Sequence, residues 1–137
     1  MHCVYSGTHA LHNPSHEVQT GHQLPVFERP RRAEEIRRAL RADGGFDIRD
    51  PTDHGREPIE NVHDPGLVRY LADAWSEWRR YSERPEFWPD TVLHPALREG
   101  MGPAPEPTGA LARLGYWCFE TMTALTPGSY AAARAAR

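Results

Sequence analysis

The sequence of 137 residues contains no lysine, two cysteines and no long apolar run. All 16 basic residues are therefore arginine, which we attribute to coding bias rather than to a set of anion clamps. Cys3 and Cys118 are too few and too far apart for a disulfide framework or a zinc site. No stretch approaches the roughly 18 apolar residues of a membrane span, and the first residues lack the features of a signal peptide. We therefore expect a soluble, reduced, cytoplasmic protein.

Net charge and chain length further limit the class of protein and the number of domains. A net charge of −3 does not provide the concentrated basic face that nucleic-acid binding requires. The length indicates one domain or part of one. Hydrophobic residues make up 39% of the chain, and 13 prolines are many for this length. That is enough apolar material for a small core but little for a complete three-layer α/β domain.

The strongest helix signal covers residues 65–81. Asp64 followed by Pro65 is a helix start, because the carboxylate accepts from free amides of the first turn and proline fits that turn. Pro85 then disfavours helix for the residue before it, so we expect the helix to end at Tyr81. Apolar residues at three- and four-residue spacing form its buried stripe. They are Leu67, Val68, Leu71, Ala74, Trp75, Trp78 and Tyr81.

A β-α-β unit is predicted before this helix. Residues 2–6 and 46–49 are short β-prone runs, and a helix over 31–42, with Ala33, Ile36 and Leu40 on its buried side, connects them. Gly44-Gly45 ends that helix. The order predicts parallel pairing with a right-handed crossover. Residues 7–23 are polar and aperiodic, so we expect a loop there.

The second half of the chain is dominated by proline. Residues 82–108 contain six prolines and can hold neither a long helix nor a central strand. Four apolar residues in this excursion need cover, namely Phe87, Trp88, Val92 and Leu93. Helices are predicted over 110–125 and 130–137, with Ser129 as the cap of the second.

An ordered set of residues runs through the chain: Ser6, His9, Leu11, Asn13, Glu17, His54, Gly55, Glu57, Val62, His63, Asp64, Gly66, Leu71, Ala74, Trp75, Trp78 and the segment 115–118. This set resembles the acetylpolyamine amidohydrolases, which belong to the histone deacetylase superfamily. The resemblance implies an α/β fold: the N-terminal part of an arginase/deacetylase-type three-layer fold with a mostly parallel sheet, incomplete in this chain. Within 1–137 it implies a β-α-β-α start over 1–81, a proline-rich excursion over 82–108 and a helical end over 109–137.

The resemblance also implies zinc-dependent hydrolysis of acetylated polyamines or similar acylated amines. Such chemistry needs a metal held by carboxylates and an imidazole, two histidines that move protons and a tyrosine at the oxyanion. The family's adjacent His-His and Asp-x-His motifs are absent from these 137 residues. We therefore expect an N-terminal fragment that lacks catalytic and metal-binding residues and is inactive alone, with zinc bound in the complete fold.

A second hypothesis is a free-standing, non-catalytic interaction module that pairs with itself or with a complete deacetylase. In the family, the segment matching 82–108 helps to form a homodimer. Phe87 and Trp88 would then be interface anchors.

The resemblance implies one substrate-binding residue in this chain. Glu17 matches an acidic residue at the rim of the family's substrate channel, where a carboxylate attracts the charged amines. An ordinary solvated loop acid is an equally good interpretation. Two further acidic rim positions of the family are Leu111 and Met122 here, so the substrate can also be an acylated amine other than a polyamine.

The histidines suggest an alternative metal site. A loop brings three of them near an acid: His9, His12, His16 and Glu17. These are ligand types of zinc or nickel, but the spacing matches no zinc motif known to us. We expect His63 and His54 to be buried structural imidazoles. Cys118 is expected to be a small buried hydrophobe rather than a nucleophile.

Overall fold

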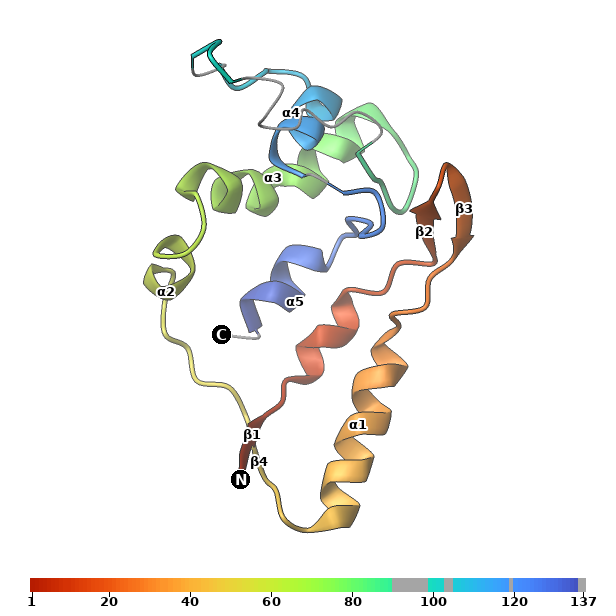
Figure 1. Cartoon of the computed structure of the whole chain (residues 1–137), viewed down its shortest axis with the longest axis vertical. Helices are drawn as coiled ribbons and strands as arrows, with labels where there is room; N and C mark the ends of the chain where they lie inside the picture. The colour runs from red at the N-terminus through yellow and green to blue at the C-terminus, as the bar shows by residue number, and fades with distance from the viewer. Residues whose placement is uncertain (90–98, 103–104, 119, 136–137) are drawn as a thin grey trace.

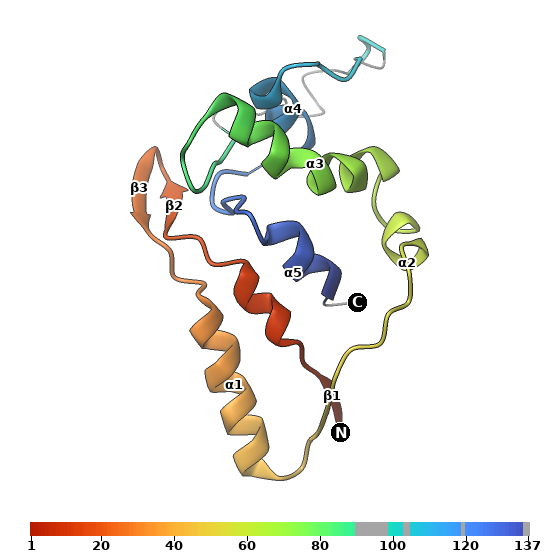
Figure 2. The same ribbon diagram turned by 180° about the vertical axis from the view of Figure 1, so that it is seen from behind.

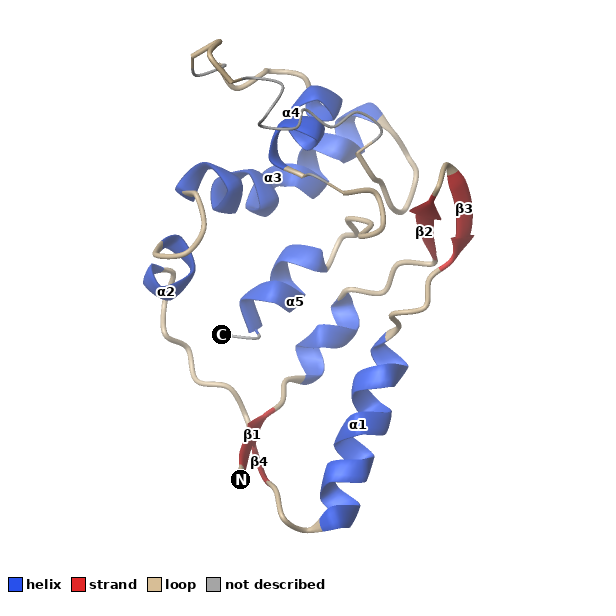
Figure 3. Cartoon of the chain, in the orientation of Figure 1, coloured by secondary structure: helices blue, strands red, loops and turns tan. Residues whose placement is uncertain are grey.

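The computed structural model describes residues 1–89, 99–102, 105–118 and 120–135. Figure 1 shows the chain coloured along its length, Figure 2 shows it from behind, and Figure 3 separates helices from strands. The elements in chain order are β1 (His2–Val4), the 3₁₀ helix η1 (Gly7–Leu11), β2 (His16–Gln19), β3 (His22–Pro25), α1 (Pro30–Asp43), β4 (Asp47–Arg49), α2 (Glu57–Glu60), α3 (Pro65–Tyr81), α4 (Ala110–Trp117) and α5 (Ser129–Ala135). No helix within these ranges is long and apolar enough to span a bilayer.

The predicted β-α-β unit is confirmed. β1 and β4 pair in parallel, with Cys3 opposite Ile48, and α1 is the crossover between them. The helix ends at Gly44, whose φ of 77° is left-handed, as expected of a C-terminal glycine. The chain is thus α/β with a short parallel sheet.

The loop predicted over 7–23 is wrong in both halves, because Gly7–Leu11 form the 3₁₀ helix η1 and two strands follow. β2 and β3 form an antiparallel hairpin in which Glu17 lies opposite Leu24. Its two-residue turn is Thr20-Gly21, both with positive φ, a geometry that matches the twist of the flanking strands. Figure 3 shows this hairpin as a second pair of strands, well separated from β1 and β4.

The predicted helix over 65–81 is confirmed residue for residue. The Asp64 carboxylate accepts from the Gly66 amide at 2.6 Å, as the sequence indicates for its N-terminus. Tyr70 is fully buried, although the predicted stripe left it out. Tyr81 was expected to be buried, but 63% of it is exposed. The buried face of α3 is therefore rotated slightly from the predicted stripe, so that it includes Tyr70 and leaves out Tyr81.

The main core lies where α3 meets α4 and the start of the proline-rich excursion. Tyr70 and Leu114 are its most buried large side chains, and Trp78 stacks on Phe87 with ring centroids 4.7 Å apart. Phe87 also pairs with Leu125 in an isolated antiparallel bridge. The interpretation of Phe87 as an interface anchor is therefore wrong, because its ring is buried within this chain. Val92 and Leu93 lie outside the described residues.

The two C-terminal helices are shorter than predicted. α4 ends at Trp117 rather than at Leu125, because Cys118 is already extended and Leu125 pairs with Phe87. The Glu120 carboxylate accepts from the amides of Met122 and Thr123 and closes a turn there. α5 begins at Ser129 as its first helical residue, and 136–137 lie outside the described part of the chain.

Three groups of side chains expected in the interior are exposed in this chain. α1 has no fully buried residue, and Ile36 is 52% exposed although Ala33 and Leu40 are partly covered. His54 and His63 are exposed, so their interpretation as buried imidazoles is wrong for this chain. Val62 beside His63 is also exposed. The described part of the chain provides little cover at these positions.

Candidate functional site

A buried carboxylate joins the hairpin to the proline-rich excursion. Glu86 is 6% exposed, and its Oε2 accepts from the Ser15 backbone amide at 2.7 Å. Its Oε1 accepts from the Ser15 hydroxyl at 2.6 Å and lies 2.8 Å from Nδ1 of His16. Ser15 and His16 stand at the start of β2, so this cluster fixes the hairpin against the segment that leads into Phe87.

Hydrogen bonding keeps Glu86 ionised. Burial by itself would raise the pKa of this carboxyl, but the hydrogen bonds from Ser15 and His16 outweigh it and hold the pKa below its ordinary value. A buried carboxylate with three donors is a satisfied group. The cluster is not arranged as a catalytic relay, because the Ser15 hydroxyl and the Glu86 carboxylate both contact Nδ1 of His16, whereas a relay uses the two different ring nitrogens.

Glu17, the predicted substrate-rim residue, lies on β2 next to this cluster. Its side chain is 5% exposed and accepts a hydrogen bond from the Gln19 side-chain amide. The expectation of a freely exposed carboxylate is therefore not met in this chain. Val18, the next residue, is tied to Thr121 in both directions, by its amide to the Thr121 carbonyl and by its carbonyl to the Thr121 hydroxyl.

A cavity of about 570 Å³ opens beside this part of β2. It is lined by Val18 and Thr121, by Trp88 of the excursion and by Leu111 of α4. Leu111 is one of the two positions at which the resemblance implies an acidic rim residue in the family. Met122, the other, follows Thr121 and is half exposed. The structure thus brings Leu111 and the neighbours of Glu17 and Met122 to one cavity.

The loop histidines do not converge. His9 lies within hydrogen-bond reach of the carbonyls of Ser6 and Pro30, whereas His16 contacts Glu86. His12 contacts the Ser129 hydroxyl at 2.8 Å. Among the residues that the structure describes, no group of three His, Cys, Asp or Glu side chains is placed to hold a metal ion. The short spacing in the sequence is therefore not a ligand set.

His12 borders a second cavity, of about 510 Å³, between α3 and α5. Its apolar walls come from Leu71 and Trp75 of α3 and from alanines of α5, with Ser129 at its polar end. Burial lowers the pKa of His12, so the neutral imidazole is favoured there. Nδ1 of His12 and the Ser129 hydroxyl lie within hydrogen-bond distance, and this contact holds α5 against the segment after η1.

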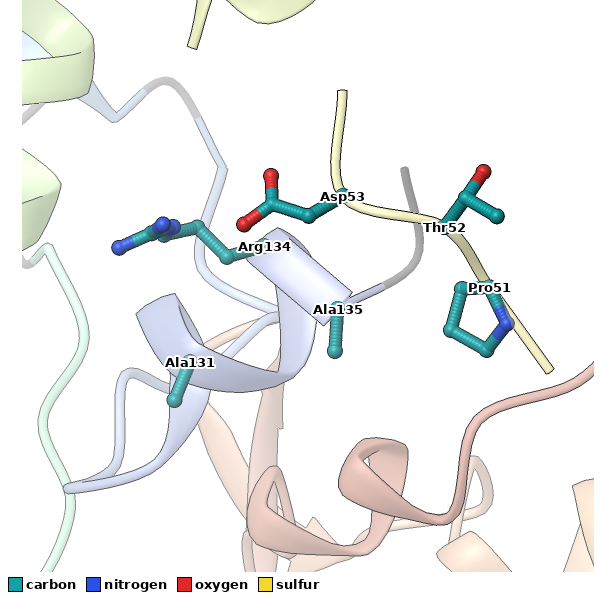
Figure 4. A pocket seen from close by; sticks show the side chains of 6 residues that line it. All are labelled: Pro51, Thr52, Asp53, Ala131, Arg134 and Ala135. Atoms are coloured by element: carbon teal, nitrogen blue, oxygen red, sulfur yellow. The ribbon is translucent and has the colours of Figure 1, made fainter. Parts of the chain in front are cut away.

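A third, smaller cavity of about 320 Å³ lies between the loop after β4 and α5. Figure 4 shows that the Asp53 carboxylate and the Arg134 guanidinium extend to the same side of this cavity, above Ala131. The Asp53 carboxylate also accepts from the Gly55 amide at 2.8 Å. Pro51, Thr52 and two alanines form the rest of its walls.

Cys118 fits its predicted role as a small hydrophobe. It packs at the edge of the main core, and burial raises the pKa of its thiol to about 11. A thiol that stays protonated is a poor nucleophile. Arg113, which the sequence did not single out, is held between Glu77 and Glu106, with its guanidinium carbon 5.0 Å from the centre of the Tyr70 ring.

No pattern in the sequence indicates the Glu86 cluster. Glu86 stands between two prolines in an aperiodic stretch, and its partners are 70 and 71 residues away. No local pattern encodes such a contact. The hairpin did have a signal, because alternating HEVQ and HQLP flank a two-residue turn that contains glycine.

Comparisons with known proteins point to one family. No protein-family profile matches the chain. Acetylpolyamine amidohydrolase 2 of Pseudomonas aeruginosa is 35% identical over 94% of this chain and 36% of its own length. Acetylpolyamine amidohydrolase of Mycoplana ramosa is 32% identical over 97% of this chain and 38% of its own length.

The similarity extends to the fold. The crystal structure of an acetylpolyamine aminohydrolase from Burkholderia pseudomallei superposes with a TM-score of 0.85 at 26% identity, covering 98% of this chain and 37% of that one. The chain therefore spans a little over a third of the length of the relatives that it matches.

Proposed function

Because the chain matches the N-terminal portion of the acetylpolyamine amidohydrolases in sequence and in fold, we propose that it is part of a deacetylase that hydrolyses the amide of an acylated amine. The superposition at a TM-score of 0.85 over 98% of the chain is the observation that carries this proposal. The strands are short, α1 is exposed and the excursion is long. An independent domain needs a core that its own helices and strands cover, and these features do not provide one.

The proposed substrate-facing side is the cavity beside β2. Glu17 is its candidate substrate-binding residue, since a carboxylate near the entrance would attract a cationic amine. The apolar neighbours Leu111 and Trp88 support an acylated amine with fewer positive charges than a polyamine. In this proposal Glu17 becomes accessible through movement of Gln19, its hydrogen-bond partner.

The implied zinc does not fit the residues described here. The histidines of the first loop contact three different partners, and no described group of three acidic, histidine or cysteine side chains is placed for a metal. We propose that the metal ligands and the catalytic groups belong to the remaining part of the fold. This chain would then contribute a wall of the substrate channel and part of the sheet.

The proposed organisation of the chain follows the same premise. Residues 1–81 start the deacetylase domain, 82–108 form the excursion and 109–137 return to it. A homodimer through 82–108 is a second possibility, for which Trp88 is the candidate anchor, because it is only partly buried. The cytoplasmic setting is also part of the proposal and rests on the scarcity of cysteine.

The proposal is tested by the coding DNA that follows Arg137, translated in all three frames. Adjacent His-His and Asp-x-His motifs in any frame are expected, because the metal and proton-transfer groups must come from there. If such motifs are found, the continuous protein is assayed on acetylated polyamines and other acetylated amines. Absence of these motifs from every frame would contradict the proposal and favour the free-standing module.

A further inference from the structure

The hairpin that carries Glu17 has little support of its own. Among the residues that the structure describes, β2 and β3 pair only with each other. An isolated pair of strands is at best marginally stable in water. A slip of one residue in such a pair would turn the Glu17 side chain to the opposite face of the hairpin. The position of Glu17 therefore depends on contacts that reach the hairpin from other parts of the chain.

Two segments make such contacts with β2. At its start, Glu86 accepts from the Ser15 amide at 2.7 Å and from the Ser15 hydroxyl at 2.6 Å. Farther along, Val18 donates its amide to the Thr121 carbonyl over 3.4 Å and accepts from the Thr121 hydroxyl at 3.0 Å. Glu17 lies between these two attachment points, which together fix the strand on both sides of it.

Glu86 provides the stronger of the two attachments. Its carboxylate is buried and ionised, and a hydrogen bond to an ionised group is about twice as strong as one between neutral groups. It accepts from Ser15 twice and also contacts His16. The contact between Val18 and Thr121 involves neutral groups only, and its amide bond is long. The position of β2 is therefore determined mainly by Glu86.

Glu86 is itself fixed by the core. The next residue, Phe87, exchanges two backbone hydrogen bonds with Leu125, at 3.1 and 2.8 Å. Its ring stacks on Trp78 of α3. The backbone of Glu86 therefore cannot shift without disturbing this packing. A continuous series of contacts leads from α3 through Phe87 and Glu86 to the start of β2, and so to Glu17.

We propose that Glu86 is a positioning residue for Glu17, which it holds in register so that the Glu17 carboxylate can meet the charged end of an acylated amine. The inference rests on the proposed function, in which Glu17 binds the substrate. Glu86 does not bind the amine itself, because it is buried and its oxygens already accept from Ser15 and contact His16. It acts on the amine only through the position of Glu17.

Labelling of carboxylates in the chain 1–137 tests whether Glu86 determines the position of Glu17. A carbodiimide with glycine amide modifies exposed carboxylates, and mass spectrometry measures the extent at each glutamate. Glu17 is buried, so it should react slowly in the unchanged chain. Glu86→Gln should increase its labelling about tenfold, the factor expected for loss of a hydrogen bond to a charged group. Glu83→Gln, at an exposed position, should leave Glu17 labelling unchanged.

Glu77 on α3 distinguishes local release of the hairpin from unfolding of the chain. It is partly buried and paired with Arg113, so its labelling should not change in Glu86→Gln. If its labelling rises as strongly as that of Glu17, this variant has unfolded, and Ser15→Ala decides instead, with increased labelling expected at Glu17 alone. Unchanged Glu17 labelling in the variant that stays folded would overturn the proposal.

Binding of an acylated amine tests whether Glu86 acts through Glu17. N-acetylputrescine and its uncharged isostere N-pentylacetamide are titrated into each variant, and the amide chemical shifts of β2 report binding. Glu86→Gln should weaken binding of the charged probe about tenfold and leave binding of the neutral probe unchanged. In a Glu17→Gln chain, the same change should have no further effect. An equal effect with and without Glu17 would overturn the proposal.

The proposed function and this inference fail in different ways. If the unchanged chain does not prefer the charged probe, the proposed role of Glu17 in binding substrate is contradicted. The labelling experiment uses no amine, so it still decides whether Glu86 determines the position of Glu17.

Discussion

Nδ1 of His12 lies 2.8 Å from the hydroxyl oxygen of Ser129, although 117 residues separate them in the chain. The Ser129 oxygen also accepts from the Thr126 amide at 2.8 Å. One hydroxyl thus connects the segment after η1 to the turn before α5. Figures 1 and 2 both show η1 and α5 side by side, so this bond fixes the two ends of the chain against each other.

The His12–Ser129 contact predicts a stability that falls in mild acid. Burial lowers the pKa of His12 in the folded chain below its ordinary value of 6.5. Between these two pKa values the unfolded chain binds more protons than the folded one, so stability rises with pH in that range. We expect the free energy of unfolding to decrease from about pH 7.5 to about pH 5.

Urea unfolding at several pH values measures this effect. The decrease should be smaller in His12→Gln and unchanged in His22→Gln, because His22 is exposed on β3. An equal pH dependence in the unchanged chain and in His12→Gln would show that His12 is not the titrating group.

Glu86→Gln should release the hairpin from the excursion. A neutral amide cannot replace the carboxylate that accepts from Ser15 twice and contacts His16, and loss of such a buried acceptor costs about 1–3 kcal/mol. Hydrogen exchange of the β2 and β3 amides is expected to accelerate more than that of α3. Glu83→Gln, at an exposed position three residues earlier, is the matched control and should leave β2 exchange unchanged.

Gly66→Ala should destabilise the contact between α3 and α4. A Cβ at Gly66 would lie 2.5 Å from Cη2 of Trp117, a ring that also donates from Nε1 to Glu106. Overpacking of this kind costs about 1–3 kcal/mol, more than the helix gains by replacing glycine. Thermal unfolding followed by tryptophan fluorescence measures the loss. Gly7→Ala, where a Cβ meets no atom within 4 Å, should have little effect.

An element could be predicted from the sequence where the residues that determine it lie close together in the chain. α3 was predicted to the residue because its cap, its stripe and its terminating proline lie within one short stretch. The parallel pairing of β1 with β4 followed from the β-α-β order of the elements. These predictions needed no knowledge of distant contacts.

The errors come from contacts between distant segments. α4 was predicted to reach Leu125, but pairing of Leu125 with Phe87 draws that segment into an extended conformation. The Glu86 cluster depends on residues about 70 positions apart. Ile36 and His63 were expected to be buried because their patterns belong to a larger fold, and the cover they need is not among the described residues of this chain.

The last prediction concerns catalysis by the chain alone. Purified 1–137 should hydrolyse neither acetylated polyamines nor acetyl-lysine peptides, with or without added zinc. Activation of water by a metal requires ligands held in fixed geometry, and the described residues offer no such group. Each loop imidazole contacts a different partner: His9 the Pro30 carbonyl, His12 the Ser129 hydroxyl and His16 the Glu86 carboxylate. Zinc could bind to them only after these contacts were broken. Release of acetate from an acetylated amine, measured with zinc and with a chelator, is the assay. Zinc-dependent turnover that disappears in His16→Ala would contradict the prediction and would establish the first loop as a metal site, whereas turnover that persists in this variant would point to a contaminating deacetylase.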